Sequence, residues 1–168
     1  MGFTPVQATV NTTPDPTIGG LAVTTPSNTG HASSTAVAVG ATTQTKSCNW
    51  SSFPAAPSGA VTVTLKVGFT RTGSLSDGGA ATSNQFLVEY STNGGGAWTT
   101  LRNDTQVTSS SSGTDSATLS TSQDLTQVQV RDKLFAGSVG GESASLTATV
   151  SGIQIEVTTR DGQLVVML

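Results

Sequence analysis

The chain has 168 residues, enough for one domain, and 35% of them are hydrophobic, so it can bury a core. Only 10% of the residues are charged and the net charge is −3, whereas charged residues make up roughly 25% of an average domain. The seven Lys and Arg residues are scattered, which argues against a nucleic-acid partner, and no apolar run approaches the roughly 20 residues that span a membrane.

Residues 1–45 are rich in Thr, Pro, Ala, Ser and Gly and contain two short strand-like pieces, Leu21–Thr24 and Ala36–Val39. We predict that residues 1–45 form an extended N-terminal arm, or the leading strands of the domain, ordered by contact. The chain begins MGFTPVQATV, which lacks the basic start and apolar run of a secretory signal. We therefore expect a protein made without an export signal; the alternative is that Met1 replaces a signal that has been removed.

Residues 46–160 carry the strongest β signal and are predicted to form a β-sandwich domain. From Val61 to Phe69, apolar residues alternate with polar ones or glycine, which is the two-residue period of a strand with one buried face. The same period recurs in residues 86–91 and 127–131. Tyr90 shares a face with two apolar residues, so we expect it to lie in the core.

The alternating apolar series that ends at Val150 and the one that begins at Ile153 are out of phase, because these two residues are three positions apart instead of two. A β-bulge or tight turn at Ser151-Gly152 would switch the inward face, and a bulge would make residues 144–159 one long bent strand. Asp161-Gly162 then predicts a two-residue hairpin turn, with residues 161–168 as the C-terminal hairpin strand.

The pattern as a whole predicts an all-β protein, an antiparallel β-sandwich that is jelly-roll-like and carries an extended N-terminal arm. We expect about seven to ten short strands. No stretch has apolar residues at helical spacing over three turns, and the abundant Gly, Ser and Thr weaken any helix.

The segment Ser91–Trp98, with the sequence STNGGGAW, resembles the Asp-box pattern of sialidases and of many secreted or phage β-proteins. It departs from that pattern at Asn93, where the family has Asp, and at Ala97, where it has Thr. The resemblance implies a β-hairpin turn covered by the ring of Trp98, not a catalytic element. A sialidase activity is not expected, because there is one such box and no arginine cluster to hold a sugar carboxylate.

On a wider scale, four pieces of residues 46–159 look like the jelly-roll modules of bacteriophage virion structural proteins, of the head decoration or tail-associated type. They are Trp50–Pro54, Tyr90–Leu101, Asp124–Arg131 and Val150–Val157. The resemblance implies a non-enzymatic virion component on the particle exterior, assembled in the host cytoplasm, most simply a capsid decoration or cement protein. A tail or fibre component is the alternative. Carbohydrate-binding modules and bacterial surface proteins share these patterns, so an adhesive module that binds glycans is a further alternative.

The residues give little support for catalysis, so we predict no enzyme activity, catalytic residue, metal or cofactor. His31 and Cys48 are the single histidine and cysteine, and together they cannot close a tetrahedral metal site. The acidic residues are spread along the chain and are expected to be mostly solvated. An enzyme of the glycosidase type is the alternative, and it would require two carboxylates facing each other across a cleft.

The predicted partners are other virion proteins, such as the major capsid protein or a tail protein, and copies of the chain itself. The closing run is apolar on both faces and would aggregate if left exposed, so we expect the domain or another subunit to cover it. The two tryptophans are expected to be buried, although exposed rings would suit sugar stacking. The predicted interaction residues are Leu164, Val165, Val166, Met167, Leu168, Trp50 and Trp98.

Overall fold

The computed structural model describes residues 33–40, 43–50, 53, 55, 60–159 and 164–167. These residues form strands and one short 3-10 helix, η1 (Leu125–Gln127). The strands are β1 (Ser33–Val39), β2 (Thr43–Trp50), β3 (Ala60–Leu75), β4 (Thr82–Ser91), β5 (Thr99–Thr105), β6 (Ser111–Leu119), β7 (Gln129–Ser138), β8 (Ser143–Thr159) and β9 (Leu164–Met167). The predicted all-β class is confirmed, and β8, with 17 residues, is the long bent strand expected for residues 144–159; β3, with 16 residues, is longer than expected.

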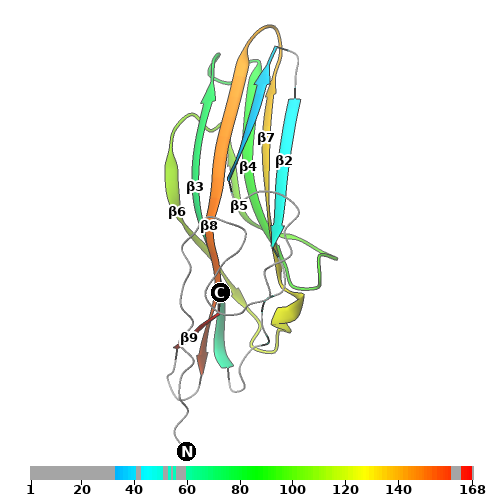
Figure 1. The fold of residues 1–168 in the computed structure, drawn as a ribbon, viewed down its shortest axis with the longest axis vertical. Coiled ribbons are helices and arrows are strands. Elements are labelled where there is room, and N and C mark those ends of the chain that lie inside the picture. Colours follow the sequence, from blue (N-terminus) through cyan, green and yellow to red (C-terminus); the bar gives the residue numbers. More distant parts are fainter. Residues whose placement is uncertain are drawn as a thin grey trace, which may run out of the picture.

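The strands form two antiparallel sheets (Figure 1). Sheet A has the order β1-β8-β3-β6, with β9 added to β8, and sheet B has the order β2-β7-β4-β5. Strand β1 pairs with β8, β2 with β7, β3 with β6 and β4 with β5, so the chain is one long hairpin rolled into two layers. This is the connectivity of an eight-stranded jelly roll, and it confirms the predicted sandwich.

The core lies between the sheets and is built by the two-residue alternation of four strands. In β3, β4, β7 and β8, every second side chain is buried over most of the strand, and the intervening side chains face solvent. The largest fully buried residues are Phe86, Leu65, Leu125, Leu134, Leu146, Ile153, Ile155, Val63, Val67, Val88 and Val128. Tyr90 is half-buried and packs against this core, as expected.

Two irregularities in the β3–β8 ladder decide which side chains point inward. The pairing shifts between Gly68 and Phe69, whose partners are Gly152 and Val150, so Ser151 is the extra residue of the predicted bulge. A second shift at Ala60 and Thr62 skips Val61. The prediction that Val61 begins the buried row is therefore wrong: it is 43% exposed, because the bulge turns it away from the core.

A buried amide ties the connection between β5 and β6 to the core. Asn84, only 2% exposed, donates hydrogen bonds to the carbonyl oxygens of Val107 and Ser145, both at 2.9 Å, and accepts one from the Val107 N–H at 2.6 Å. Gly73 lies directly beside this amide, and a Cβ there would come within 2.6 Å of the Val107 oxygen. The connection approaches the core this closely because position 73 has no side chain.

The ends of the chain enter the sheets at defined places. Strand β1 pairs with β8 and β2 with β7, so residues 33–39 and 43–50 are strands of the sandwich. Strand β9 pairs antiparallel with β8, as in the predicted C-terminal hairpin, while the Asp161-Gly162 turn lies outside the described residues. Residues 1–32 also lie outside them, so the N-terminal arm stays a prediction. No helix in the described parts of the chain has the length and apolar character needed to cross a membrane.

Candidate functional site

The Asp-box-like segment forms the turn between β4 and β5, as predicted. The Asn93 Oδ1 accepts hydrogen bonds from the Ser91 hydroxyl and the Ala97 N–H, both at 2.8 Å. The Ser91 Oγ accepts from the Gly95 N–H at 2.9 Å. Gly94 and Gly95 have φ angles of 70° and 90°, the left-handed region that glycine adopts without strain. The side-chain oxygen of Asn93 thus stabilises the turn by accepting two hydrogen bonds, and the Asp of the family pattern would supply an equivalent oxygen.

Trp98 leaves this turn and lies on the outer face of sheet B. The Arg131 guanidinium of β7 is 3.8 Å from the centre of its ring, a cation–π contact that leaves the ring half-buried. Arg131 also donates to Glu89 of β4 at 2.7 Å, and Lys133 lies 3.2 Å from the same carboxylate. We call these four residues the Trp98 cluster. Burial raises the pKa of Glu89, but the hydrogen bonds and positive charges of Arg131 and Lys133 outweigh it and hold that pKa below its usual value.

The rest of the outer face of sheet B is mixed in polarity. Leu87 and Phe135 are half-buried there without packing on the core. The Phe135 ring covers Gly137, where an added Cβ would come within 2.9 Å of the ring. Gln85 of β4 donates to the Asn103 side chain of β5 at 2.7 Å. With the Trp98 cluster, these side chains form a strip of aromatic, amide and paired ionic groups.

A second ionic group, which we call the edge cluster, closes the sandwich where β5 and β6 lie. Arg102 of β5 donates to both oxygens of Asp115 on β6, at 2.6 and 2.8 Å, and to Asp104 at 2.9 Å. Arg71 of β3 also donates to Asp104, at 2.7 Å. The Arg102 guanidinium lies 3.7 Å from the ring centre of Phe69, a core residue. The four charged side chains thus bridge the two sheets over the edge of the core.

The same contacts shift the pKa values of two members of the edge cluster, Asp104 and Arg102. Burial raises the pKa of Asp104, but the hydrogen bonds and charges of Arg71 and Arg102 outweigh it, so that pKa lies below its usual value. The hydrogen bonds from Arg102 to Asp115 raise the pKa of Arg102. Both shifts favour the charged forms of Asp104 and Arg102, which are paired with each other.

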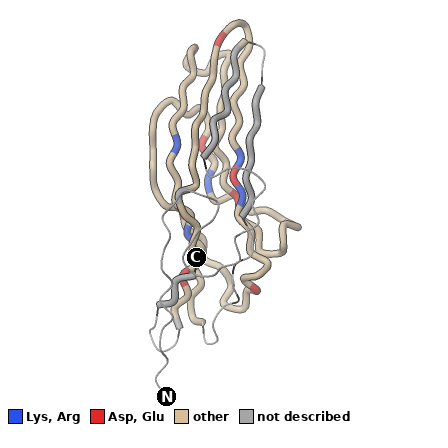
Figure 2. The backbone as a smooth tube through the Cα atoms, viewed as in Figure 1, with Lys and Arg blue, Asp and Glu red and all other residues tan. Residues whose placement is uncertain are grey.

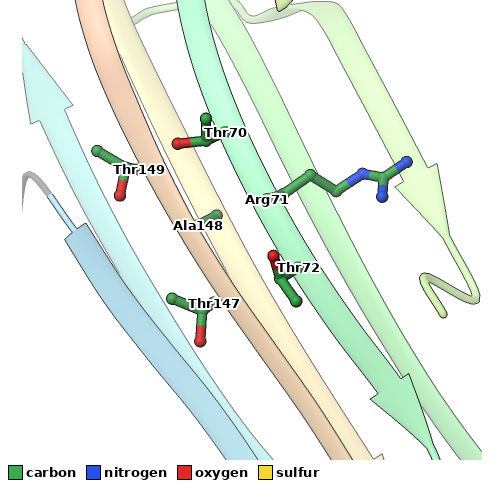
Figure 3. Close-up of a pocket in the computed structure, with 6 residues that line it drawn as sticks. All are labelled: Thr70, Arg71, Thr72, Thr147, Ala148 and Thr149. Carbon is green, nitrogen blue, oxygen red and sulfur yellow. The ribbon is translucent and has the colours of Figure 1, made fainter. Parts of the chain in front are cut away.

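The outer face of sheet A is lined with hydroxyl groups. Figure 3 shows Thr70 and Thr72 of β3 beside Thr147 and Thr149 of β8, around a shallow hollow of about 80 Å³. A second hollow of about 250 Å³ continues across β3 to Ser110–Ser112. Hydroxyl pairs bridge strands on this face, as between Ser74 of β3 and Ser145 of β8 at 2.7 Å. The surface offers hydroxyl and methyl groups around these hollows, and further along the same face Lys66 and Glu156 form an ion pair at 2.7 Å.

The predicted interaction residues at the C-terminus are placed by the register of β9. Val165 pairs with Val157 and Met167 with Ile155, in the rows of two buried core residues. Leu164 and Val166 fall in the rows of Thr158 and Glu156, which are half-buried residues of the opposite face. Leu168 lies outside the described residues.

The two tryptophans can be compared only in part. Trp50 ends β2, where its backbone pairs with Val130, and its side chain lies outside the described part of the structure. Trp98 is half-buried, less than expected, because one side of its ring is covered by Arg131 and the turn while the rest meets solvent.

The residues considered for catalysis are placed as follows. His31 lies outside the described residues, and Cys48 pairs with Asp132 across β2 and β7. Among the described residues, no group of three or more His, Cys, Asp or Glu side chains is arranged to hold a metal ion. The expectation that the acids are mostly solvated is wrong: Glu89, Asp104 and Asp115 are largely buried in ion pairs, and Asp132 is fully buried.

No protein-family model matches the chain, and no curated protein sequence matches it. It is similar at low scores to solved structures described as "Family 16 Carbohydrate Binding Module-2" (6% identity, TM-score 0.31, covering 71% of this chain and 73% of that one) and "CBM4 structure and function" (12% identity, TM-score 0.32, covering 73% and 82%). A third is "Structure of infectious bursal disease virus Gx strain" (12% identity, TM-score 0.24, covering 80% and 38%). Likenesses this weak carry no conclusion about function.

Proposed function

We propose that the chain is a non-enzymatic structural component of a bacteriophage virion, a capsid decoration or cement protein that stabilises the shell through its edge strands and leading segment. The observation that carries the proposal is that the described charges are used within the domain. The chain has seven Lys and Arg residues. The side chains of five of them are described, and each pairs with a carboxylate of its own chain: Lys66, Arg71, Arg102, Arg131 and Lys133.

This internal pairing leaves surfaces that are inexpensive to bury against a neighbour. Among the described residues, Figure 2 shows acidic and basic positions spread over the backbone, several of them close to one of opposite sign. Between the ion pairs, the outer face of sheet A presents hydroxyl groups, and the outer face of sheet B presents amide, aliphatic and aromatic groups. Burying a hydrogen-bonded hydroxyl costs far less than burying an unpaired charge. A protein of this kind is suited to shape-matched contact with uncharged neighbours, and weak contacts repeated over a lattice add up to firm attachment.

The test is whether the protein travels with particles. Antibodies against the purified chain would be used to probe phage particles induced from the source culture and banded by density, followed by immunogold labelling of the bands. We expect the chain to band with intact particles and the label to decorate heads. Label on tails or fibres would support the alternative position in the particle. A chain confined to the particle-free fractions would refute the proposal.

The Trp98 cluster favours one second candidate, a glycan-binding module on the outer face of sheet B. The half-buried ring of Trp98 and the paired amides of Gln85 and Asn103 offer the stacking and hydrogen-bonding groups that sugars use. Glycan-array binding that is lost in Trp98→Ala and retained in Thr114→Ala, a matched surface change on sheet A, would establish it. An array without binding at any glycan would remove it.

A further inference from the structure

The edge of sheet A formed by β1 and β9 has a geometry that suits pairing with itself. Both strands pair with the same side of β8, β1 along Ser143–Thr149 and β9 along Ile155–Thr158. Both are antiparallel to β8, so they run in the same direction, one beyond the other (Figure 1). The midpoint between them falls beside Gly152, next to the bulge in β8.

The sequence of this edge lacks the features that prevent strand addition. Natural sheets protect their edges with charged side chains, prolines and inward-pointing charges. Strand β6, at the opposite edge of sheet A, has the inward-pointing Asp115 held by Arg102. Strands β1 (Ser33–Val39) and β9 (Leu164–Met167) contain no charged residue and no proline.

We propose that the β1/β9 edge is an interface between two copies of this chain, related by a two-fold axis that passes near Gly152. Because β1 and β9 run in the same direction, such an axis sets β1 of one copy antiparallel to β9 of the other, twice over. The two copies of sheet A then continue into one another through backbone hydrogen bonds. This inference rests on the proposed function and names its first partner, a second copy.

A second copy of the chain is the partner that fits this edge, because β1 of one copy can pair with β9 of the other. An isologous contact requires one patch to fit itself, and here the longer strand, seven residues, meets the shorter one, four residues, on both sides of the axis. The residues of β9 whose backbone register falls in the outer row, Leu164 and Val166, are apolar. Val61, exposed on neighbouring β3 beside Thr158, continues this apolar end of the sheet.

Disulfide trapping tests the arrangement in the full chain. Thr35→Cys and Val166→Cys are combined in a Cys48→Ala background. Thr35 pairs with Thr147 and Val166 with Glu156, so the two positions lie about 30 Å apart within one copy at about 3.3 Å per residue. A disulfide needs Cα atoms about 4.4–6.8 Å apart, so only a bond between copies can form. We expect a covalent dimer under mild oxidation.

The matched control moves one cysteine to the opposite edge, as Thr114→Cys with Val166→Cys. We expect the β1/β9 pair to cross-link at least about tenfold faster than this control, because pairing holds its cysteines at high effective concentration. Equal rates, together with a monomer in analytical ultracentrifugation, would overturn the interface. A ladder of larger species would also overturn it, since head-to-tail contacts form chains and a two-fold contact closes at two.

A charge variant checks the same contact without oxidation. Val166→Lys places a charged side chain against β1 of the other copy on each side of the axis, and we expect dimer dissociation to rise at least about tenfold, whereas Thr114→Lys on β6 leaves it unchanged. Retention of the dimer in Val166→Lys would count against this interface. Banding with phage particles is a separate measurement, so a monomer that still bands with particles would refute the dimer and leave the proposed function standing.

Discussion

The two edges of sheet A differ in where their charges lie. At the β6 edge, Asp115 points inward and meets Arg102, and Asp104 and Arg71 complete a cluster that covers Phe69 at the margin of the core. At the β1/β9 edge, the sequence has no charge at all over the paired strands. The β6 edge therefore has the inward-pointing charge that prevents strand addition, whereas β1 and β9 have the uncharged sequences typical of interior strands.

The contrast shows how a chain with few charges can still control its contacts. Only 10% of the residues are charged, yet four of them are gathered where an added strand would have to displace or desolvate them. An inward-pointing charge makes strand addition costly because its partners would lose water or hydrogen bonds. Placing such charges at one edge directs association to the other.

The largest effect should come from Asn84, the buried amide that holds the β5–β6 connection next to the β6 edge. Asn84→Ala removes three hydrogen bonds and leaves the backbone groups of Val107 and Ser145 without these partners. We expect the free energy of unfolding to fall by about 3 kcal/mol, measured by urea denaturation. Gln85→Ala, one residue on and facing solvent, is the control and should change it by less than about 0.5 kcal/mol. Similar losses in both variants would show that the amide does not anchor the connection.

Removing the centre of the edge cluster should have the next largest effect. Arg102→Ala leaves Asp104 and Asp115 largely buried without their shared cation and uncovers the Phe69 ring. We expect a loss of about 2 kcal/mol, below the range for fully buried pairs because these groups keep some contact with water. Lys66→Ala, which breaks one more exposed pair with Glu156, should cost about 0.5 kcal/mol. A larger loss in the free energy of unfolding for Lys66→Ala than for Arg102→Ala would show that the edge cluster is not the stronger of the two ionic contacts.

The pH dependence of stability should show how much Asp104 of the edge cluster contributes. The pKa of Asp104 is lower in the folded chain than its usual value of 3.8, so its contribution is present above about that pH and is lost as the pH falls through the folded value. Asp104→Asn should lower stability at neutral pH by about 1 kcal/mol and flatten the acid limb of the stability curve. Unfolding midpoints measured from neutral pH down to acid pH would show this. An acid limb as steep as that of the wild type would exclude Asp104 as its source.

The sequence was a good guide where burial imposes a period and a poor one where it does not. Residues 61–69 and 86–91 alternate because one face of each strand packs on the core. The change in phase of the apolar pattern near Ser151 predicted a bulge, and the structure contains it. Strand β6 (Ser111–Leu119) was missed, and β5 (Thr99–Thr105) was predicted only as the second strand of the hairpin at the Asp-box-like turn. They are edge strands rich in Thr, Ser and Asp, with few apolar side chains to mark the inward face.

The edge cluster was missed for a related reason. Its members come from three strands and are spaced up to 44 positions apart in the chain, from Arg71 to Asp115. No local spacing marks such a group, because the jelly-roll pairing brings it together only after both sheets form. The Asp-box-like turn was found because its hydrogen bonds join residues within five positions of one another, from Ser91 to Gly95 and from Asn93 to Ala97.

The smallest effect is expected at the end of sheet A where β9 adds. Val61 is 43% exposed because the bulge in β3 turns it outward, whereas Val63, two residues on, is 1% exposed. Val61→Thr should therefore change the free energy of unfolding by less than about 0.5 kcal/mol, while Val63→Thr buries a hydroxyl in the core and should cost about 2 kcal/mol. Equal costs in urea denaturation would place Val61 in the core row and remove the bulge. If the β1/β9 edge pairs as proposed, Val61→Thr should also weaken the dimer slightly in analytical ultracentrifugation, because it makes the apolar end of the sheet more polar without touching the strand pairing itself.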